Sequence, residues 1–274
     1  MKTQVLIYDD NCPLCAWYSG LFVKYGFLRA EERKPFSSID DAMISAINFE
    51  KAKEEIPLID VETKEVVYGI DALVAILSVK FPFVQKICAP APVDWFLRRL
   101  YRLISYNRKV IVATKCSTGA IDCAPSYNYF YRLLFLCIFL VFNSLMLYPV
   151  HRQLLMNIPG YHKSFGEVQA AHFSLVAINC LLAWSLPVKK AFEYIGQVNM
   201  LAVLTIAFLL LFIPVVSYLQ VPGVVIQGYF LLLTFFIIKE YLRRMDYAGI
   251  IQHNRWIAAL NLSSIALLIL YIIG

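Results

Sequence analysis

The chain has 274 residues, of which 60% are hydrophobic, and its mean hydropathy is +0.64. This composition is too apolar for an ordinary soluble protein. The seven cysteines are odd in number and unevenly spaced, so they do not match the disulfide framework of a small secreted domain. The charges are unevenly divided: residues 1–128 hold 16 Lys/Arg and 15 Asp/Glu, whereas residues 129–274 hold 9 and 4. This division predicts a soluble N-terminal domain joined to a C-terminal membrane domain.

The N-terminus predicts a strand, a tight turn and a helix. Val5–Tyr8 is a β-branched and aromatic run suited to a buried strand, and the polar residues that follow it favour a turn. Cys12 then falls at the N-cap of a helix, with Pro13 at the first helical position. The helix is expected to continue to about Tyr25.

Two cysteines at such a helix start predict redox chemistry. The unpaired N–H groups and the dipole of the helix stabilise a thiolate, so the pKa of Cys12 should be low and Cys12 should act as the nucleophile. Cys15 lies one turn further in and would be the resolving cysteine. Asp9 could transfer the proton of Cys15 or simply cap the turn, and the sequence leaves both roles open.

These residues also carry a family resemblance. Asp9, Cys12 and Cys15 form a D-x-x-C-x-x-C motif directly after the strand, which resembles the DCC family of predicted thiol–disulfide oxidoreductases. The similarity extends through Gly69–Ala72 and Tyr101–Arg108 and covers about the first 110 residues. It implies a thioredoxin-like fold and a redox-active cysteine pair.

The rest of the N-terminal domain, residues 1–91, fits a small α/β sheet. Further strands are expected at 35–39, 56–61 and 65–68, and helices at 40–55 and 71–80, which gives the order β-α-β-α-β-β-α. In thioredoxin-like folds a cis-Pro packs against the cysteine pair. The resemblance therefore implies that the Ile56–Pro57 bond is cis, with Pro57 facing the pair.

Residues 92–128 link this domain to the membrane. Val93, Phe96, Leu97, Leu100 and Ile104 recur at helical spacing beside three arginines, which is typical of a basic amphipathic helix at a membrane–water boundary. A helix packed on the soluble domain with a solvated basic side is the alternative. Cys116 and Cys123 follow in a loop, where they either relay electrons as a second exchangeable disulfide or have no role.

Residues 129–274 predict an all-α transmembrane bundle. Five apolar stretches have about the length that spans a bilayer, at about 130–150, 168–188, 198–219, 224–242 and 256–273. Lys and Arg gather before the first span, between the second and third, and between the fourth and fifth. Together with the missing signal peptide, this predicts a cytoplasmic N-terminal domain and an outside C-terminus in a bacterial inner membrane.

Metal and cofactor sites are weakly indicated. Half of a zinc site is the alternative for the cysteine pair, and only Cys116 and Cys123 could complete it, because all four histidines lie in the membrane half. Polar residues in or near the spans either bond helix to helix or line a quinone site that uses His172; they are Asn143, His172, Asn179 and Asn261.

The sequence therefore predicts a membrane-anchored thiol–disulfide oxidoreductase. It would exchange disulfides with a protein partner, need no organic cofactor or metal, contact lipid, and bind no nucleic acid. One alternative is a docking or assembly subunit of a membrane complex. Another is a quinone-linked membrane thiol oxidoreductase whose relay runs through Cys116 and Cys123.

Overall fold

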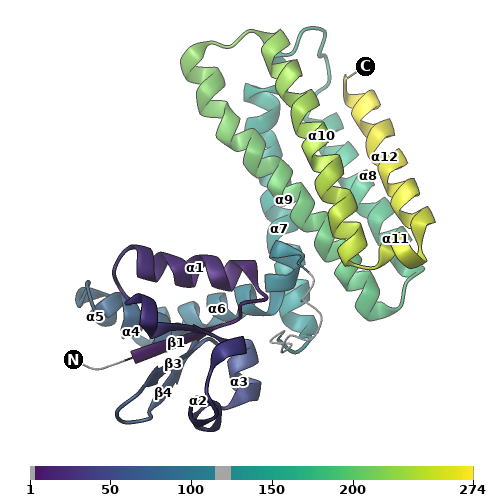
Figure 1. The fold of residues 1–274 in the computed structure, drawn as a ribbon. Helices are drawn as coiled ribbons and strands as arrows, with labels where there is room; N and C mark the ends of the chain where they lie inside the picture. Colours follow the sequence, from purple (N-terminus) through teal and green to yellow (C-terminus); the bar gives the residue numbers. More distant parts are fainter. Residues whose placement is uncertain (1–3, 115–124, 274) are drawn as a thin grey trace. The chain divides into compact units, whose positions relative to one another are not determined.

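The computed structural model describes residues 4–114 and 125–273. Contacts between residues divide the chain into two compact units, Met1–Arg132 and Leu133–Gly274. Figure 1 shows a small sheet with covering helices in the first unit and a bundle of long helices in the second. The predicted combination of an α/β domain and an all-α membrane domain matches this architecture.

The sheet of the first unit has four strands in the order β2-β1-β3-β4. The central strand β1 (Gln4–Tyr8) runs parallel to β2 (Arg33–Pro35) and antiparallel to β3 (Pro57–Asp60). The last strand, β4 (Val66–Tyr68), pairs antiparallel with β3. Because β1 is central and largely buried, the loop at its C-terminal end is held rigidly from both sides.

Helices cover both faces of the sheet (Figure 1). Leu6 and Leu58 pack on one face with side chains from α1 (Pro13–Lys24), α4 (Gly69–Ser78) and α6 (Ala91–Val112). Val5, Ile7 and Ile59 point to the other face, as the alternation of strand side chains requires, and meet α2 (Asp41–Ala46) and α3 (Phe49–Glu54). A short helix, α5 (Phe83–Cys88), joins α4 to α6, and two 3₁₀ turns, η1 (Ala30–Glu32) and η2 (Phe36–Ser38), flank β2.

Two expectations from sequence need correction here. The second strand covers Arg33–Pro35 instead of 35–39, because Arg33 packs into the fold: its guanidinium stacks 3.7 Å from the Tyr8 ring centroid and its Nε donates to Ser19 Oγ. The helix expected at 40–55 is two helices, because Asn48 provides a second N-cap and accepts a hydrogen bond from the Lys51 N–H.

The prediction of a cis bond before Pro57 is also wrong. The Ile56–Pro57 peptide bond is trans. Pro57 is the first residue of β3 and pairs with Tyr68, while the Ile56 carbonyl accepts a hydrogen bond from the Gly69 N–H. The extended chain therefore passes directly from Ile56 into the sheet, and proline at a strand start costs no ladder hydrogen bond.

The second unit is built from long apolar helices. They are α7 (Tyr129–Gln153), α8 (Phe165–Trp184), α9 (Val188–Leu219), α10 (Gly223–Tyr247) and α12 (Arg255–Ile273), with the short η3 (Leu155–Asn157) and α11 (Ile250–His253) between them. Within the described residues, five helices are long and apolar enough to span a membrane. This number is the one that the sequence predicted, and it fits an integral membrane protein.

Candidate active site

The cysteine pair lies where β1 turns into α1. Cys12 is the N-cap of α1 in an extended conformation and Pro13 occupies the first turn, as the sequence predicted. The turn is held by its own backbone, because the Cys12 N–H donates to the Asp9 carbonyl at 3.2 Å and the Ala16 N–H donates to the Cys12 carbonyl at 2.9 Å. The two cysteines are thus fixed one helical turn apart.

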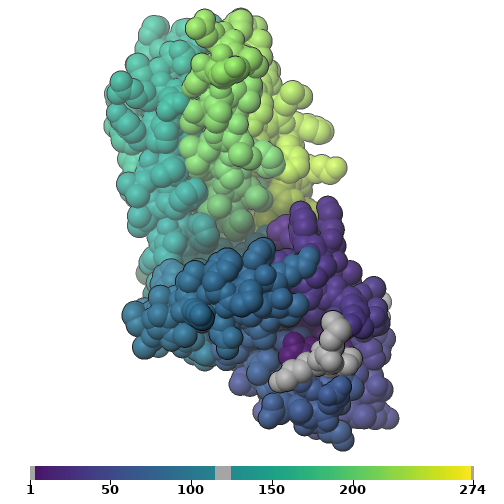
Figure 2. Space-filling view, turned by 90° about the vertical axis from the view of Figure 1, so that its left-hand side faces the viewer, coloured from purple at the N-terminus to yellow at the C-terminus, as the bar shows by residue number. Residues whose placement is uncertain are grey.

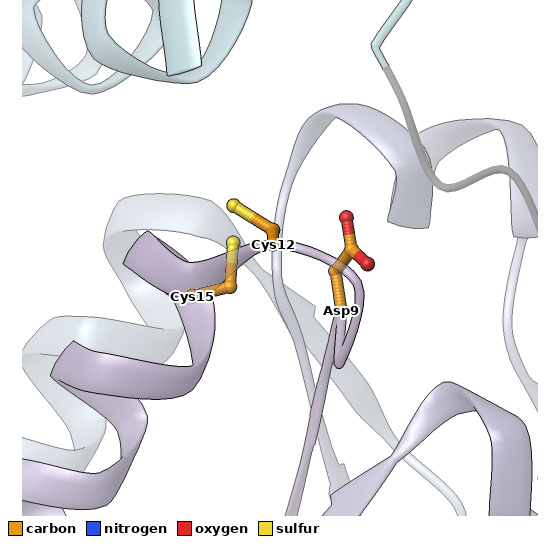
Figure 3. A group of neighbouring side chains, drawn as sticks. All are labelled: Asp9, Cys12 and Cys15. Carbon is orange, nitrogen blue, oxygen red and sulfur yellow. The ribbon is translucent and has the colours of Figure 1, made fainter. Parts of the chain in front are cut away.

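The two thiols and one carboxylate form a compact buried group. Cys12 and Cys15 are both free thiols, and their Sγ atoms lie within 4.8 Å of one another and of an Asp9 carboxylate oxygen. Cys12 remains 9% exposed and Cys15 5%. In Figure 3 both sulfurs project to the same side of the start of α1, with Asp9 across the turn. Both cysteines are thus buried, with Cys12 slightly the more exposed of the two residues.

A buried arginine completes the site from a distant part of the chain. The Nη1 of Arg108, in α6, lies 3.6 Å from Cys15 Sγ, and its Nη2 lies 3.4 Å from Asp9 Oδ2. Nη2 also donates to the Lys53 carbonyl at 3.1 Å. The guanidinium therefore contacts both the resolving thiol and the carboxylate, and it places a positive charge next to the sulfurs.

Contacts along α6 hold Arg108 in this position. Tyr101 accepts a hydrogen bond from the Ile56 N–H at 2.9 Å, and Ser105 donates to the Glu54 carbonyl. Both side chains lie on the face of α6 that carries Arg108, at helical spacing. Sequence reasoning gave Arg108 no role. The available signal was its place in the segment Tyr101–Arg108 that resembles the DCC family.

The electrostatic environment gives the two thiols different pKa values. The Cys15 side chain, which can donate a hydrogen bond to the Cys12 sulfur, has the largest effect on the pKa of Cys12. Together with the Cys15 backbone N–H and the Arg108 charge, and against the opposing effects of burial and of Asp9, it lowers this pKa to about 6. The same side-chain hydrogen bond and burial raise the pKa of Cys15. At neutral pH the structure therefore favours a thiolate on Cys12 and a thiol on Cys15.

Asp9 caps the turn after β1 and also lies where it can accept a proton from Cys15. Its Oδ1 accepts a hydrogen bond from the Asn11 N–H at 3.0 Å, so it does cap the turn. Burial raises the pKa of the Asp9 carboxyl, and the charge of Arg108 opposes that shift. A carboxyl group with a raised pKa beside Cys15 is a suitable proton acceptor, so the two roles that the sequence left open are compatible.

Asp9, Cys12 and Cys15 are also a possible set of metal ligands by distance. Structural zinc takes four ligands, and the two other cysteines suggested by the sequence, Cys116 and Cys123, lie outside the described residues. The guanidinium of Arg108 already contacts two of the three ligand residues and would repel a cation. The electrostatics of this donor set therefore suit an anionic sulfur better than a metal ion.

The polar residues of the membrane unit form contacts between helices. The Asn261 amide and the Tyr194 hydroxyl both donate to Asn179 Oδ1, at 2.7 Å each, which joins α12, α9 and α8. Asn143 donates to Asn199 at 3.3 Å. The Nε2 of His172 makes no hydrogen bond within the described residues. The asparagines thus support the helix-to-helix interpretation, and a quinone site at His172 stays a prediction.

Comparisons with known proteins do not assign a family or a function to this site. No family model matches the chain, and neither the curated proteins nor the solved structures contain a match. The resemblance to the DCC family therefore depends on the motif residues and their surroundings alone.

Proposed function

We propose that this chain is a membrane-anchored thiol–disulfide oxidoreductase of the DCC type. The observation that carries the proposal is the buried group at the start of α1, in which a helix N-cap cysteine, a second cysteine, a carboxylate and an arginine lie together. The strand order β2-β1-β3-β4, with β1 and β2 parallel, supports a thioredoxin-like arrangement for the first unit.

The first step would be an attack by the Cys12 thiolate on one sulfur of a disulfide in a partner protein. A bond forms between the Cys12 sulfur and that sulfur, and the partner's own S–S bond breaks. The leaving sulfur departs as a thiolate and takes a proton from water. A Cys12 pKa of about 6 keeps most of this thiol ionised at neutral pH without the loss of nucleophilicity that a much lower value would bring.

The second step would release the partner. Cys15 gives its proton to the Asp9 carboxylate and attacks the Cys12 sulfur, and the second partner sulfur leaves as a thiolate that is protonated from solvent. The partner has then gained two electrons, and Cys12 and Cys15 form a disulfide. Arg108, 3.6 Å from the Cys15 sulfur, stabilises the negative charge that develops there. An external thiol reductant restores the pair, and no organic cofactor is needed.

The membrane unit would hold this chemistry at a bilayer. The loop charges favour a cytoplasmic first unit and an outside C-terminus in a bacterial inner membrane. In that orientation the cellular thiol pool could supply the reductant. Other subunits of a membrane complex remain candidate partners under this proposal.

The test uses the full-length protein in detergent micelles with a fluorescent reporter disulfide and a thiol reductant. The unmodified protein should turn over, and Cys12→Ser should reduce the rate to that of the reductant alone, because a serine hydroxyl is not ionised at neutral pH. Cys137→Ser, which removes an exposed thiol far along the sequence in α7, is the matched control and should keep full activity. Equal rates for Cys12→Ser and the unmodified protein would overturn the proposal.

A further inference from the structure

One face of α6 exposes large apolar side chains that the first unit does not bury. Trp95, Phe96, Leu100 and Ile104 are 62%, 57%, 39% and 44% exposed. They follow one another at one- and four-residue spacings over roughly 14 Å of helix. A continuous row of this kind on a small domain usually marks an interaction surface. We call these four residues the α6 apolar face.

The α6 apolar face is distinct from the side by which the helix packs on the sheet. That side carries Tyr101, Ser105 and Arg108, which bond to Ile56, Glu54 and the active-site group. The sequence analysis had grouped Val93 and Leu97 with this apolar stripe, but the structure leaves both only partly exposed. Figure 2 shows α5 and α6, in blue, at the surface of the first unit. One side of α6 therefore packs on its own domain, and the other side has no partner among the described residues.

The charges around this face are mostly positive. Residues 91–112 contain five Lys/Arg, of which Arg108 is buried in the active-site group, and one acidic residue, Asp94, which is paired with Arg98. Arg99 and Arg102 are both exposed; Arg102 lies 3.6 Å from Glu55, and the Arg99 guanidinium lies 5.6 Å from the Trp95 ring centroid. Aromatic rings together with arginines are the side chains that anchor helices among lipid headgroups, and the positive charge complements anionic lipid.

Direct contacts tie α6 to the beginning of the first apolar helix. The Tyr106 and Tyr131 rings stack with centroids 5.1 Å apart, and the Asn107 amide donates to the Tyr131 carbonyl at 3.1 Å. The Arg99 guanidinium also reaches the Tyr131 hydroxyl at 3.4 Å. Tyr131 is in the first turn of α7, in the part of that helix that belongs to the first unit, and α7 continues as the first candidate span. The α6 apolar face is therefore attached to a helix end that must lie near a bilayer surface.

We infer that the α6 apolar face lies on the headgroup region of an anionic bilayer and holds the thiol domain against the membrane. This inference does not depend on the thiol chemistry. It specifies what contacts the first unit when the chain is in a membrane: lipid with acidic headgroups, met by Trp95 and its apolar neighbours with Arg99 and Arg102 at the edge.

The test measures tryptophan quenching in the full-length chain, which has four tryptophans. One variant keeps only Trp95 and a second keeps only Trp17, which lies in α1 and is 63% exposed, the same as Trp95 within one percentage point. Each is placed in nanodiscs of phosphatidylcholine with phosphatidylglycerol, which contain a lipid spin-labelled near the headgroup. Both leaflets of a nanodisc are alike, so the result does not depend on orientation.

Trp95 should be quenched at least about twofold more than Trp17, with a blue-shifted emission, because its ring lies among the lipids. Arg99→Glu with Arg102→Glu should bring the quenching of Trp95 close to that of Trp17. Lys51→Glu with Lys53→Glu makes the same change in charge on α3, which covers the other face of the sheet, and should leave Trp95 quenched. Circular dichroism checks that each variant is folded.

Quenching of Trp95 no greater than that of Trp17 would overturn the inference, because the α6 apolar face would then be left for a protein partner. Equal quenching in nanodiscs of pure phosphatidylcholine and in anionic nanodiscs would overturn its electrostatic part.

Discussion

Arg108 in the first unit and Arg244 in the second are both buried, but these two arginines have different partners. Arg108 in the first unit contacts a carboxylate and a thiol, both of which titrate. Arg244 in α10 is 2% exposed and donates to Glu240 and to Gln197 of α9, at 2.8 Å each. Arg108 therefore acts on groups that can change charge during a reaction, whereas Arg244 joins two helices.

This contrast shows that burial alone does not identify a functional charge. The Arg244 guanidinium, buried with an acidic side chain and an amide, fixes the packing of α10 against α9. A guanidinium buried beside two cysteines changes which sulfur is ionised. The chemistry of the neighbours distinguishes the two cases, and it also gives different predictions for the same substitution.

The largest effects should come from removing each arginine. Arg108→Gln should lower the free energy of unfolding of the first unit by about 3 to 5 kcal/mol, because the buried Asp9 carboxylate loses its charged partner. Arg244→Gln should lower that of the second unit by less, because Glu240 keeps its ion pair with Arg243. Only Arg108→Gln should also raise the pKa of Cys12, which the guanidinium lowers. Chemical denaturation in micelles and the pH dependence of Cys12 alkylation measure the two effects.

A conservative variant of Arg108 separates the effect of its charge from the effect of its side-chain shape. Arg108→Lys keeps the positive charge and should keep most of the low Cys12 pKa, even where stability falls. An equal shift in the Cys12 pKa for Arg244→Gln and Arg108→Gln would contradict a specific role for Arg108.

The next largest effect should follow from Asp9→Asn. An amide cannot accept the proton of Cys15, so release of a mixed disulfide should slow by about a hundredfold, which is the low end of general-base effects. The first attack by Cys12 should not slow, because the carboxylate charge opposes ionisation of Cys12. Stopped-flow measurements of the two steps would show the difference. Asp10→Asn, at the exposed neighbouring residue, is the matched control, and an equal effect there would refute proton transfer by Asp9.

Cys15 should influence Cys12 through its ability to donate a hydrogen bond. The Cys15 side chain is the largest cause of the low pKa of Cys12, so Cys15→Ala should raise that pKa more than Cys15→Ser, which keeps a hydroxyl donor. The rate of Cys12 alkylation as a function of pH measures both variants. Identical titration curves for the two variants would mean that hydrogen bonding from residue 15 does not set the Cys12 pKa.

The membrane unit should respond more weakly to loss of a neutral contact. Asn179→Ala removes the oxygen that accepts from both Tyr194 and Asn261, and it should cost about 0.6 to 1.7 kcal/mol of unfolding free energy, the range measured for hydrogen bonds between membrane helices. Denaturation in micelles measures this cost, with Asn157→Ala, at an exposed position, as the control. A change in Cys12 reactivity in Asn179→Ala would contradict the functional separation drawn here.

The sequence predicted those features that are encoded locally. The N-cap position of Cys12, the spacing to Cys15 and the five apolar helices all follow from neighbouring residues, and the structure agrees with them. The helix at 40–55 was predicted as one element because Asn48 is a weak stop signal until its side chain is seen to cap α3. The cis bond at Pro57 was expected from the resemblance alone, and the structure has this bond trans.

Arg108 could not be predicted because its role depends on contacts distant in sequence. It lies 93 residues from Cys15, and its function appears only when α6 packs against α1 and the end of β1. The amphipathic pattern of α6 was ambiguous for a related reason. The packed side of α6 buries the polar side chains of Ser105 and Arg108, and the sequence alone does not distinguish such a side from a solvated one.

The measurement that tests the account most directly is the titration of Cys12 in the full-length protein. Alkylation for short, fixed times at a series of pH values, followed by mass spectrometry of the peptide that contains Cys12, gives its pKa separately from those of the other six cysteines. The account predicts a midpoint at about pH 6, with the rate rising as pH increases through that value. A midpoint at about 8.5, the value of an ordinary cysteine, would contradict the central claim that this site holds Cys12 as a thiolate.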